Sequence, residues 1–96
     1  MSSAVRVLIP TLLRPLMDDR SSVQVALSSR MPLSTILDVL GEDHDIFARR
    51  IRDETGALRR YVNIYVDGED VRRIDGLATA VSPGAEVMII QSVAGG

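Results

Sequence analysis

The fold is decided by the stretch Leu58-Arg59-Arg60-Tyr61-Val62-Asn63-Ile64-Tyr65-Val66-Asp67, which carries the strongest strand pattern in the chain. β-Branched and aromatic residues dominate it and alternate at a period of two, which is typical of a strand with one face on a core. We expect Ile64 and the valines two residues away to point inward and the two tyrosines to point outward. Asp67-Gly68 is a tight-turn pair, and it predicts a hairpin whose second arm, Glu69 to Ile74, lies at a sheet edge.

Three other stretches have a strand pattern. Ala4 to Ile9 alternates until a proline ends it, and Ser22 to Leu27 places valines and a leucine on one face. The residues between them, Thr11 to Ser21, predict a loop, so the first two strands are expected to form a hairpin. Ala85 to Ile90 is the last strand, and it follows the turn residues Ser82-Pro83-Gly84.

One main amphipathic helix is expected between the second strand and the deciding stretch. Apolar residues recur at i, i+3, i+4 and i+7 from Leu33 to Leu40, behind a proline that suits a first helical turn and ahead of a glycine that suits a helix end. This apolar stripe has to be buried against the sheet. Asp45 is placed to cap a shorter second helix, which we expect to end at Gly56.

This order of elements describes one α+β domain. Strand, strand, helix, short helix, strand, short strand and strand form a single mixed sheet with the main helix packed on one face, if the first and last strands pair at its centre. That layout is a β-grasp (ubiquitin-like) roll. We expect residues 1–90 to form this domain, with Leu37 and Ile64 buried between helix and sheet. Residues 91–96 are expected to form an extended, flexible C-terminal tail.

Composition excludes several classes of function. The 96 residues have a net charge of −2 and three aromatic side chains, so they offer neither a basic field nor a stacking surface for nucleic acid. No apolar run is long enough to span a membrane, and the first residues lack a signal-peptide core, so we expect a cytoplasmic protein. The chain has no cysteine and one histidine. We therefore expect no metal site, no bound cofactor and no side-chain catalysis, with His44 and Arg14 solvated in loops.

The last six residues, Gln91-Ser92-Val93-Ala94-Gly95-Gly96, predict the reactive part of the molecule. Glycine lacks a Cβ, so a Gly-Gly end can lie extended in a slot too narrow for other residues, and no side chain shields its last carbonyl carbon from a nucleophile. Six extended residues span on the order of 20 Å, so the terminal carboxylate could enter the active site of another protein. A frayed terminus is the alternative interpretation.

A second candidate site lies on the sheet face that the main helix leaves uncovered. If the valines of the first and last strands point inward, the residues between them point outward and gather beside the root of the tail. A contiguous apolar patch of this kind is more often a binding site, while a bare surface or a layer covered by a loop is the alternative. The predicted partner-binding patch consists of Leu8, Tyr61, Tyr65, Met88 and Ile90, with Arg72 and Arg73 at its rim.

Three segments together match a known pattern. They are Arg60-Tyr61-Val62-Asn63-Ile64-Tyr65-Val66-Asp67-Gly68-Glu69-Asp70-Val71-Arg72, Asp75-Gly76-Leu77-Ala78-Thr79 and Val93-Ala94-Gly95-Gly96. They resemble the MoaD/ThiS family of ubiquitin-like sulfur carriers. Near the start, Ile9-Pro10-Thr11-Leu12-Leu13-Arg14-Pro15 is similar to the carriers that serve bacterial cysteine biosynthesis, a subgroup separate from the thiamine and molybdopterin carriers. The resemblance covers nearly the whole chain.

The resemblance implies a carrier protein that is not itself an enzyme. In the family, a ubiquitin-activating-like (E1-like) enzyme uses ATP to adenylate the last glycine, and a sulfur donor converts the acyl adenylate to a thiocarboxylate. Carried over, the reactive carboxylate belongs to Gly96, while Val93, Ala94 and Gly95 form the tail that enters the partner. The implied partners are this adenylating and sulfur-transferring enzyme and a sulfur-accepting synthase, which in the subgroup is a cysteine synthase-like enzyme acting on an activated serine.

The sequence departs from the family at the root of the tail. Gln91-Ser92 stands where Pro-Ala or Pro-Pro usually precedes the last four residues, and Ser82-Pro83-Gly84-Ala85 stands where an acidic turn is common. Three other interpretations stay open. They are a carrier that supplies sulfur to a natural product such as a thiosugar, the small subunit of molybdopterin synthase, and a protein modifier conjugated to lysines through Gly96.

Overall fold

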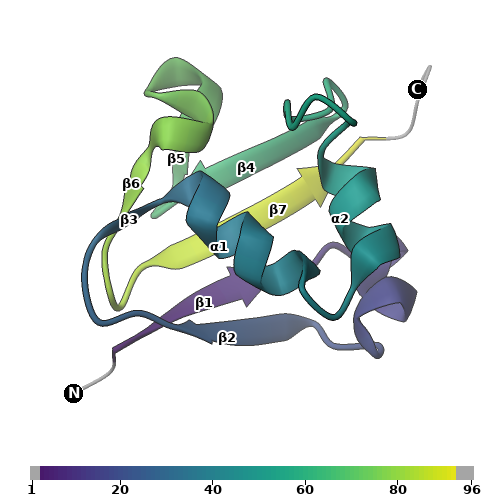
Figure 1. The fold of residues 1–96 in the computed structure, drawn as a ribbon, viewed down its shortest axis with the longest axis horizontal. Helices are drawn as coiled ribbons and strands as arrows, with labels where there is room; N and C mark the ends of the chain where they lie inside the picture. Colours follow the sequence, from purple (N-terminus) through teal and green to yellow (C-terminus); the bar gives the residue numbers. More distant parts are fainter. Residues whose placement is uncertain (1–2, 93–96) are drawn as a thin grey trace.

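The computed structural model of the chain describes residues 3–92. The strands are β1 (Ala4–Leu8), β2 (Ser22–Ala26), β3 (Met31–Pro32), β4 (Val62–Val66), β5 (Glu69–Asp70), β6 (Ala80–Val81) and β7 (Glu86–Gln91). Five of them form one sheet in the order β2-β1-β7-β4-β5, and β3 pairs with β6 in a second, two-stranded sheet (Figure 1). β1 and β7 run parallel at the centre, and the other neighbours are antiparallel. The predicted mixed sheet is confirmed.

The helical segments lie mainly on one side of this sheet. They are α1 (Leu33–Gly41), α2 (Asp45–Ile51) and the 3-10 helices η1 (Thr11–Met17), η2 (Val71–Arg73) and η3 (Gly76–Ala78). α1 crosses one face of the sheet, and α2 packs beside it at the end where β7 stops (Figure 1). A mixed sheet with a parallel central pair and one main helix on a single face is the β-grasp roll that the sequence predicts.

β4 forms from the deciding stretch and pairs with β7 along its whole length. Its alternation is the predicted one, because Val62, Ile64 and Val66 are buried and the residues between them are half-buried. The strand is shorter than predicted, since it begins at Val62. Leu58 instead makes an isolated bridge with Arg52, within the connection from α2 to β4.

The predicted hairpin after β4 is confirmed, but its second arm is shorter than expected. Asp67 and Gly68 both have positive φ, at 49° and 88°, as the tight turn requires. β5 then stops at Asp70, whose carboxylate accepts a hydrogen bond from the backbone N–H of Arg72 at 2.9 Å. This contact starts the η2 turn and buries Val71, so the strand predicted as far as Ile74 does not form.

The prediction of a loop between the first two strands is wrong for residues Thr11–Met17. Thr11–Met17 forms η1, whose residues Leu13 and Met17 are buried in the core. α2 packs against η1. The hairpin of β1 and β2 is confirmed, with Val5 opposite Val25 and Val7 opposite Val23.

The ends of the two α-helices differ in detail from the prediction. α1 includes Gly41 as its last residue, and a Cβ there would lie 2.9 Å from the Cβ of Ala48 in α2, so this glycine lets the two helices approach closely. α2 begins at Asp45 with His44 in the capping position, and no side chain caps it. The helix stops at Ile51, and Gly56 lies in the turn that follows, with φ +87°.

The two-stranded sheet was not predicted. Met31 pairs with Val81 and Pro32 with Ala80, and the backbone N–H of Leu33 donates to the carbonyl of Thr79 at 2.8 Å. These bonds hold the start of α1 against the segment that leads into β7. The predicted positions of Leu37 and Ile64 are confirmed, because both side chains are buried in the core between α1 and the sheet.

One pair of isoleucines separates core burial from helix effects. Ile36 in α1 is fully buried, whereas Ile46 in α2 is 60% exposed. Ile36→Ala is expected to lower the free energy of unfolding by about 2 to 5 kcal/mol, because it deletes buried methyl groups and leaves a cavity. Ile46→Ala should change the free energy of unfolding by no more than about 0.5 kcal/mol. Urea unfolding of both variants measures this, and equal losses would contradict the packing of α1 on the sheet.

Candidate functional site at the root of the tail

β7 leads the chain to the candidate reactive end. Gln91 pairs with Val62 of β4, and the backbone N–H of Ser92 donates to the carbonyl of Tyr61 at 2.8 Å. The tail that the sequence places from residue 91 is thus held on the sheet as far as Ser92. The predicted tail residues Val93, Ala94, Gly95 and Gly96 lie outside the described residues. The site is therefore built from what surrounds Ser92.

Three apolar side chains form a row across the uncovered face of the sheet. Leu8 of β1 is the register partner of Met88, and Met88 is the register partner of Tyr65 in β4. All three are half-buried. Ile90 lies two residues nearer the tail on the same face of β7 and is 39% exposed. These four residues point to the face that the sequence assigned to them.

η1 lies beside this face, and residues of η1, β1 and β7 together line a groove. Leu12 stands out from η1 with 60% of its surface exposed, which is as much as any large apolar side chain of residues 3–92. The sequence did not identify Leu12, because the segment was interpreted as a loop without faces. The available signal was the pair Leu12-Leu13, since adjacent residues of a helical turn cannot both enter the core. The groove is lined by Leu8, Ile9, Pro10, Thr11, Leu12, Arg14, Met88, Ile89, Ile90 and Gln91.

Two polar groups of the groove have contrasting surroundings. The Nε of Arg14 donates to the carbonyl of Ile9 at 3.0 Å, so this arginine is half-buried along the groove and not simply solvated as expected. The side-chain oxygen of Gln91 is buried and has no hydrogen-bond partner in the described structure. A buried acceptor without a donor is costly. This buried oxygen belongs to the last residue of β7, directly before Ser92.

Tyr61 differs from the predicted patch. It precedes β4, is half-buried and packs against the core, so it does not extend the outward row. Its carbonyl, which accepts from Ser92, is the part that acts at the tail root.

Arg72 also has a different place from the one predicted. Its guanidinium donates to the carbonyls of Val62 at 2.6 Å and Arg59 at 2.7 Å, and to the side chain of Asn63 at 2.5 Å. It therefore fastens η2 to the start of β4, opposite the end of β7. The side chain of Arg73 makes no such bond in residues 3–92 and lines a separate hollow with Tyr65 and Ile74.

The connection from α2 to β4 is ordered by one carboxylate. Asp53 accepts from the backbone and hydroxyl of Thr55 at 2.8 and 2.6 Å and from the backbone N–H of Ala57 at 3.2 Å. The hydroxyl bond from Thr55 is the main cause that lowers the pKa of Asp53 below its ordinary value. This connection delivers Tyr61 to the root of the tail.

The remaining chemistry of the described residues is sparse. No cluster of three or more histidine or acidic side chains that could hold a metal ion occurs in residues 3–92. None of the helices in that range has the length and apolar character that crossing a membrane requires. His44 is half-buried, not fully solvated, and its Nε2 lies 3.3 Å from a carboxylate oxygen of Asp18.

Two neighbouring arginines test the assignment of Arg72. Arg72→Gln is expected to lower the free energy of unfolding by about 1 to 2 kcal/mol, because the shorter side chain cannot reach the carbonyls of Val62 and Arg59. Arg73→Gln, which removes the same charge one residue away, should have an effect below about 0.5 kcal/mol. The comparison is made by chemical denaturation at one pH and salt concentration. Similar losses would show that Arg72 acts only through its charge.

The fold and the groove define a ubiquitin-like protein whose last strand, β7, ends beside an apolar groove. The chain belongs to the ThiS family, whose model matches residues 7–96. Sulfur carrier protein CysO of Mycobacterium tuberculosis is 42% identical over 94 residues, which cover 96% of this chain and 98% of that protein. A crystal structure of Mycobacterium tuberculosis CysO superposes with a TM-score of 0.80 at 38% identity, covering 93% of this chain and 99% of that one. The predicted family and fold are confirmed.

Two further relatives bear on partners. A chain in the crystal structure of the Amycolatopsis orientalis BexX/CysO complex superposes with a TM-score of 0.81 at 37% identity, covering 97% of this chain and all of that one. Small archaeal modifier protein 3 of Haloferax volcanii is 34% identical over 61 residues, which are 64% of this chain and 65% of that protein.

Proposed function

We propose that this chain is a sulfur carrier whose Gly96 carboxylate is adenylated and then converted to a thiocarboxylate. The observation that carries the proposal is the 42% identity to a sulfur carrier protein over 94 residues, together with a family match that runs to the last residue, Gly96. Composition supports it, because a chain without cysteine and with a single histidine has few other groups for group transfer.

The chemistry needs two steps because a carboxylate is a poor electrophile. In the first, a Gly96 carboxylate oxygen attacks the α-phosphorus of ATP, which releases pyrophosphate and leaves an acyl adenylate. In the second, a sulfide equivalent from a donor attacks the carbonyl carbon, and AMP leaves with its bridging oxygen. The product is a thiocarboxylate, a soft nucleophile that remains attached to the carrier. Both steps belong to a partner enzyme, which binds ATP; this chain supplies the carboxylate and the surface that is recognised.

The groove is the surface that we assign to the activating enzyme. Its exposed members Leu12 and Ile90 would be covered by a docked partner. The groove borders Ser92, so a partner that fills it receives the tail at the same time.

The sulfur acceptor that we propose is an activated serine bound to a cysteine synthase-like enzyme. The similarity to CysO favours this acceptor over molybdopterin synthesis. Supply of sulfur to a natural product such as a thiosugar is the alternative acceptor pathway.

Mass spectrometry of the intact protein tests the carrier function. Incubation with ATP, a cognate activating enzyme and sulfide is expected to replace one oxygen by sulfur at Gly96. A variant with one alanine added after Gly96 should fold normally but gain no sulfur, because the added residue moves the carboxylate and puts a Cβ at the reacting end. Equal loading of the two proteins, with the added alanine still attached, would contradict the proposal.

A second experiment tests the groove separately from the tail. Met88→Asp is expected to raise the Kd for the activating enzyme at least about tenfold, or about 1.4 kcal/mol, because it places a charge in the apolar row. Leu12→Asp changes an exposed residue of the same groove and should act in the same direction without affecting the fold. Ile46→Asp, on α2, is the control and should leave the Kd unchanged.

The outcomes of this binding experiment are distinguishable. Calorimetry gives the Kd, and the melting temperature of each variant reports folding. Unchanged affinity of well-folded Met88→Asp and Leu12→Asp would remove the groove from recognition, while loading at Gly96 would still support the carrier function.

A protein modifier is the second candidate function, because small archaeal modifier protein 3 of Haloferax volcanii is 34% identical over 64% of this chain. It ranks second because CysO is 42% identical over 96% of the chain. A modifier would be found joined to lysines of other proteins through Gly96. Affinity capture of tagged protein followed by peptide mapping would detect that isopeptide remnant, which a sulfur carrier does not leave.

A further inference from the structure

β2 is an open edge of the five-stranded sheet. It pairs with β1 on one side, and no strand of residues 3–92 pairs on the other. Edge strands that stay unpaired usually carry a charge, a proline or a bulge that blocks a further strand. Ser22–Ala26 has no charged residue and no proline, and its register with β1 runs without a bulge. Nothing in the strand itself prevents another strand from adding to it.

The hydrogen bonds between β1 and β2 show which backbone N–H and C=O groups of β2 do not bond to β1. The backbone N–H of Ile9 donates to the carbonyl of Ser21, and that of Leu27 donates to the carbonyl of Ser3. Bonded pairs alternate along an antiparallel ladder, so Val23 and Val25 bond to β1. The N–H and C=O groups of Ser22, Gln24 and Ala26 therefore point away from the sheet, ready for a neighbouring strand.

The sequence of β2 is nearly symmetric about Gln24. Read in either direction, Ser22-Val23-Gln24-Val25-Ala26 presents a small residue, valine, glutamine, valine and a small residue. In an antiparallel pair of two such strands centred on Gln24, each outward-bonding residue faces another outward-bonding residue. Val23 then faces the second copy's Val25, Gln24 faces its equivalent, and Ser22 faces Ala26, with no like charges opposed.

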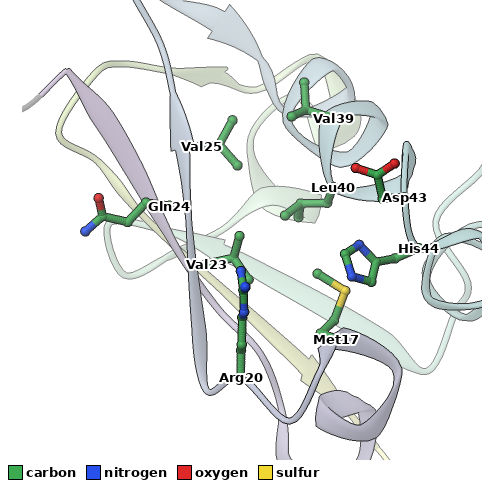
Figure 2. A pocket seen from close by; sticks show the side chains of 9 residues that line it. All are labelled: Met17, Arg20, Val23, Gln24, Val25, Val39, Leu40, Asp43 and His44. Atoms are coloured by element: carbon green, nitrogen blue, oxygen red, sulfur yellow. The ribbon is translucent and has the colours of Figure 1, made fainter.

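The inward side of the edge has a hollow that such a pairing would cover. Figure 2 shows Val23 and Val25 of β2 facing Val39 and Leu40 of α1, while Gln24 points away to the other face of the sheet. The hollow measures about 160 Å³, and its apolar lining from β2, α1 and Met17 is joined by the polar side chains Arg20, Gln24, Asp43 and His44. Val39 is 41% exposed although its helix packs on the sheet. A valine from a strand added beside β2 would lie over this hollow.

We propose that two copies of this chain associate through β2, forming one continuous sheet with an antiparallel β2–β2 junction centred on Gln24. A second copy fits better than an unrelated extended peptide because β2 is complementary to itself in the antiparallel direction. Its length, the positions of its free backbone groups and the order of its side chains are nearly the same in both directions. Short strands bury little area, so the association is of the weak, reversible class. β1 separates the tail root on the central strand β7 from the junction.

A charge exchange at Gln24 tests the junction. Sedimentation equilibrium between about 10 μM and about 1 mM is expected to show the wild-type mass rising from 10.5 kDa toward twice that value. Gln24→Lys and Gln24→Glu each put like charges opposite each other and should remain monomeric. An equimolar mixture of the two variants should dimerise again, because the charges then attract.

A lysine placed elsewhere on the surface is the control for added charge. Ala78→Lys adds the same charge on η3, far from the edge, and should dimerise like the wild type. Melting curves confirm that each variant is folded; Gln24 is exposed, so neither substitution should disturb the core. A wild-type protein that stays monomeric across the range would overturn the proposal. A dimer that survives Gln24→Lys would overturn it too, since the contact would then lie elsewhere.

Discussion

The parallel pairing of β1 with β7 is the constraint on which the rest of the structure depends. Two strands from opposite ends of the chain lie side by side at the centre of the sheet, with Val7 opposite Val87 and Leu8 opposite Met88. Parallel neighbours need a long crossover, and here the crossover contains α1, α2 and β4. The last strand is therefore flanked on both sides, by β1 and β4, and its end is fixed by the body of the protein.

This arrangement also explains why the groove is assembled where it is. Parallel strands end at the same edge of a sheet, so η1, which follows β1, meets the chain as it leaves β7. β4 runs the opposite way, so the beginning of β4 reaches the same place and brings the carbonyl of Tyr61 to Ser92. Asp53 and Arg72 then hold the approach to β4, one through the turn before it and the other through η2. Segments remote in sequence thus converge on one end of the molecule.

Features with a local cause could be predicted from the sequence, and those with a tertiary cause could not. Alternation within β4 and the helical spacing from Leu33 to Leu40 are properties of short windows, so the elements, their buried faces and the outward row of Leu8, Tyr65, Met88 and Ile90 follow from them. η1 forms because Leu13 and Met17 find α2, and β3 and β6 form because each is the other's only partner among the described strands. The sequence places Arg72 at the rim of the patch, because the carbonyls of Val62 and Arg59 that accept its hydrogen bonds come close to it only when the chain folds. The bond from Arg14 to the carbonyl of Ile9 and the burial of the Gln91 oxygen likewise depend on the folded chain.

The hydrogen bond from Ser92 to Tyr61 sets the length of a tether. With the chain fixed at Ser92, four residues reach at most about 14 Å, whereas six would reach about 20 Å. If a partner docks on the groove as proposed, the volume within reach of the terminal carboxylate is about threefold smaller for four residues than for six. Its effective concentration at the partner's active site rises by a similar factor, which corresponds to about 0.7 kcal/mol. Under the function proposed above, this single backbone contact at the end of β7 would link binding of the body of the protein to delivery of the Gly96 carboxylate.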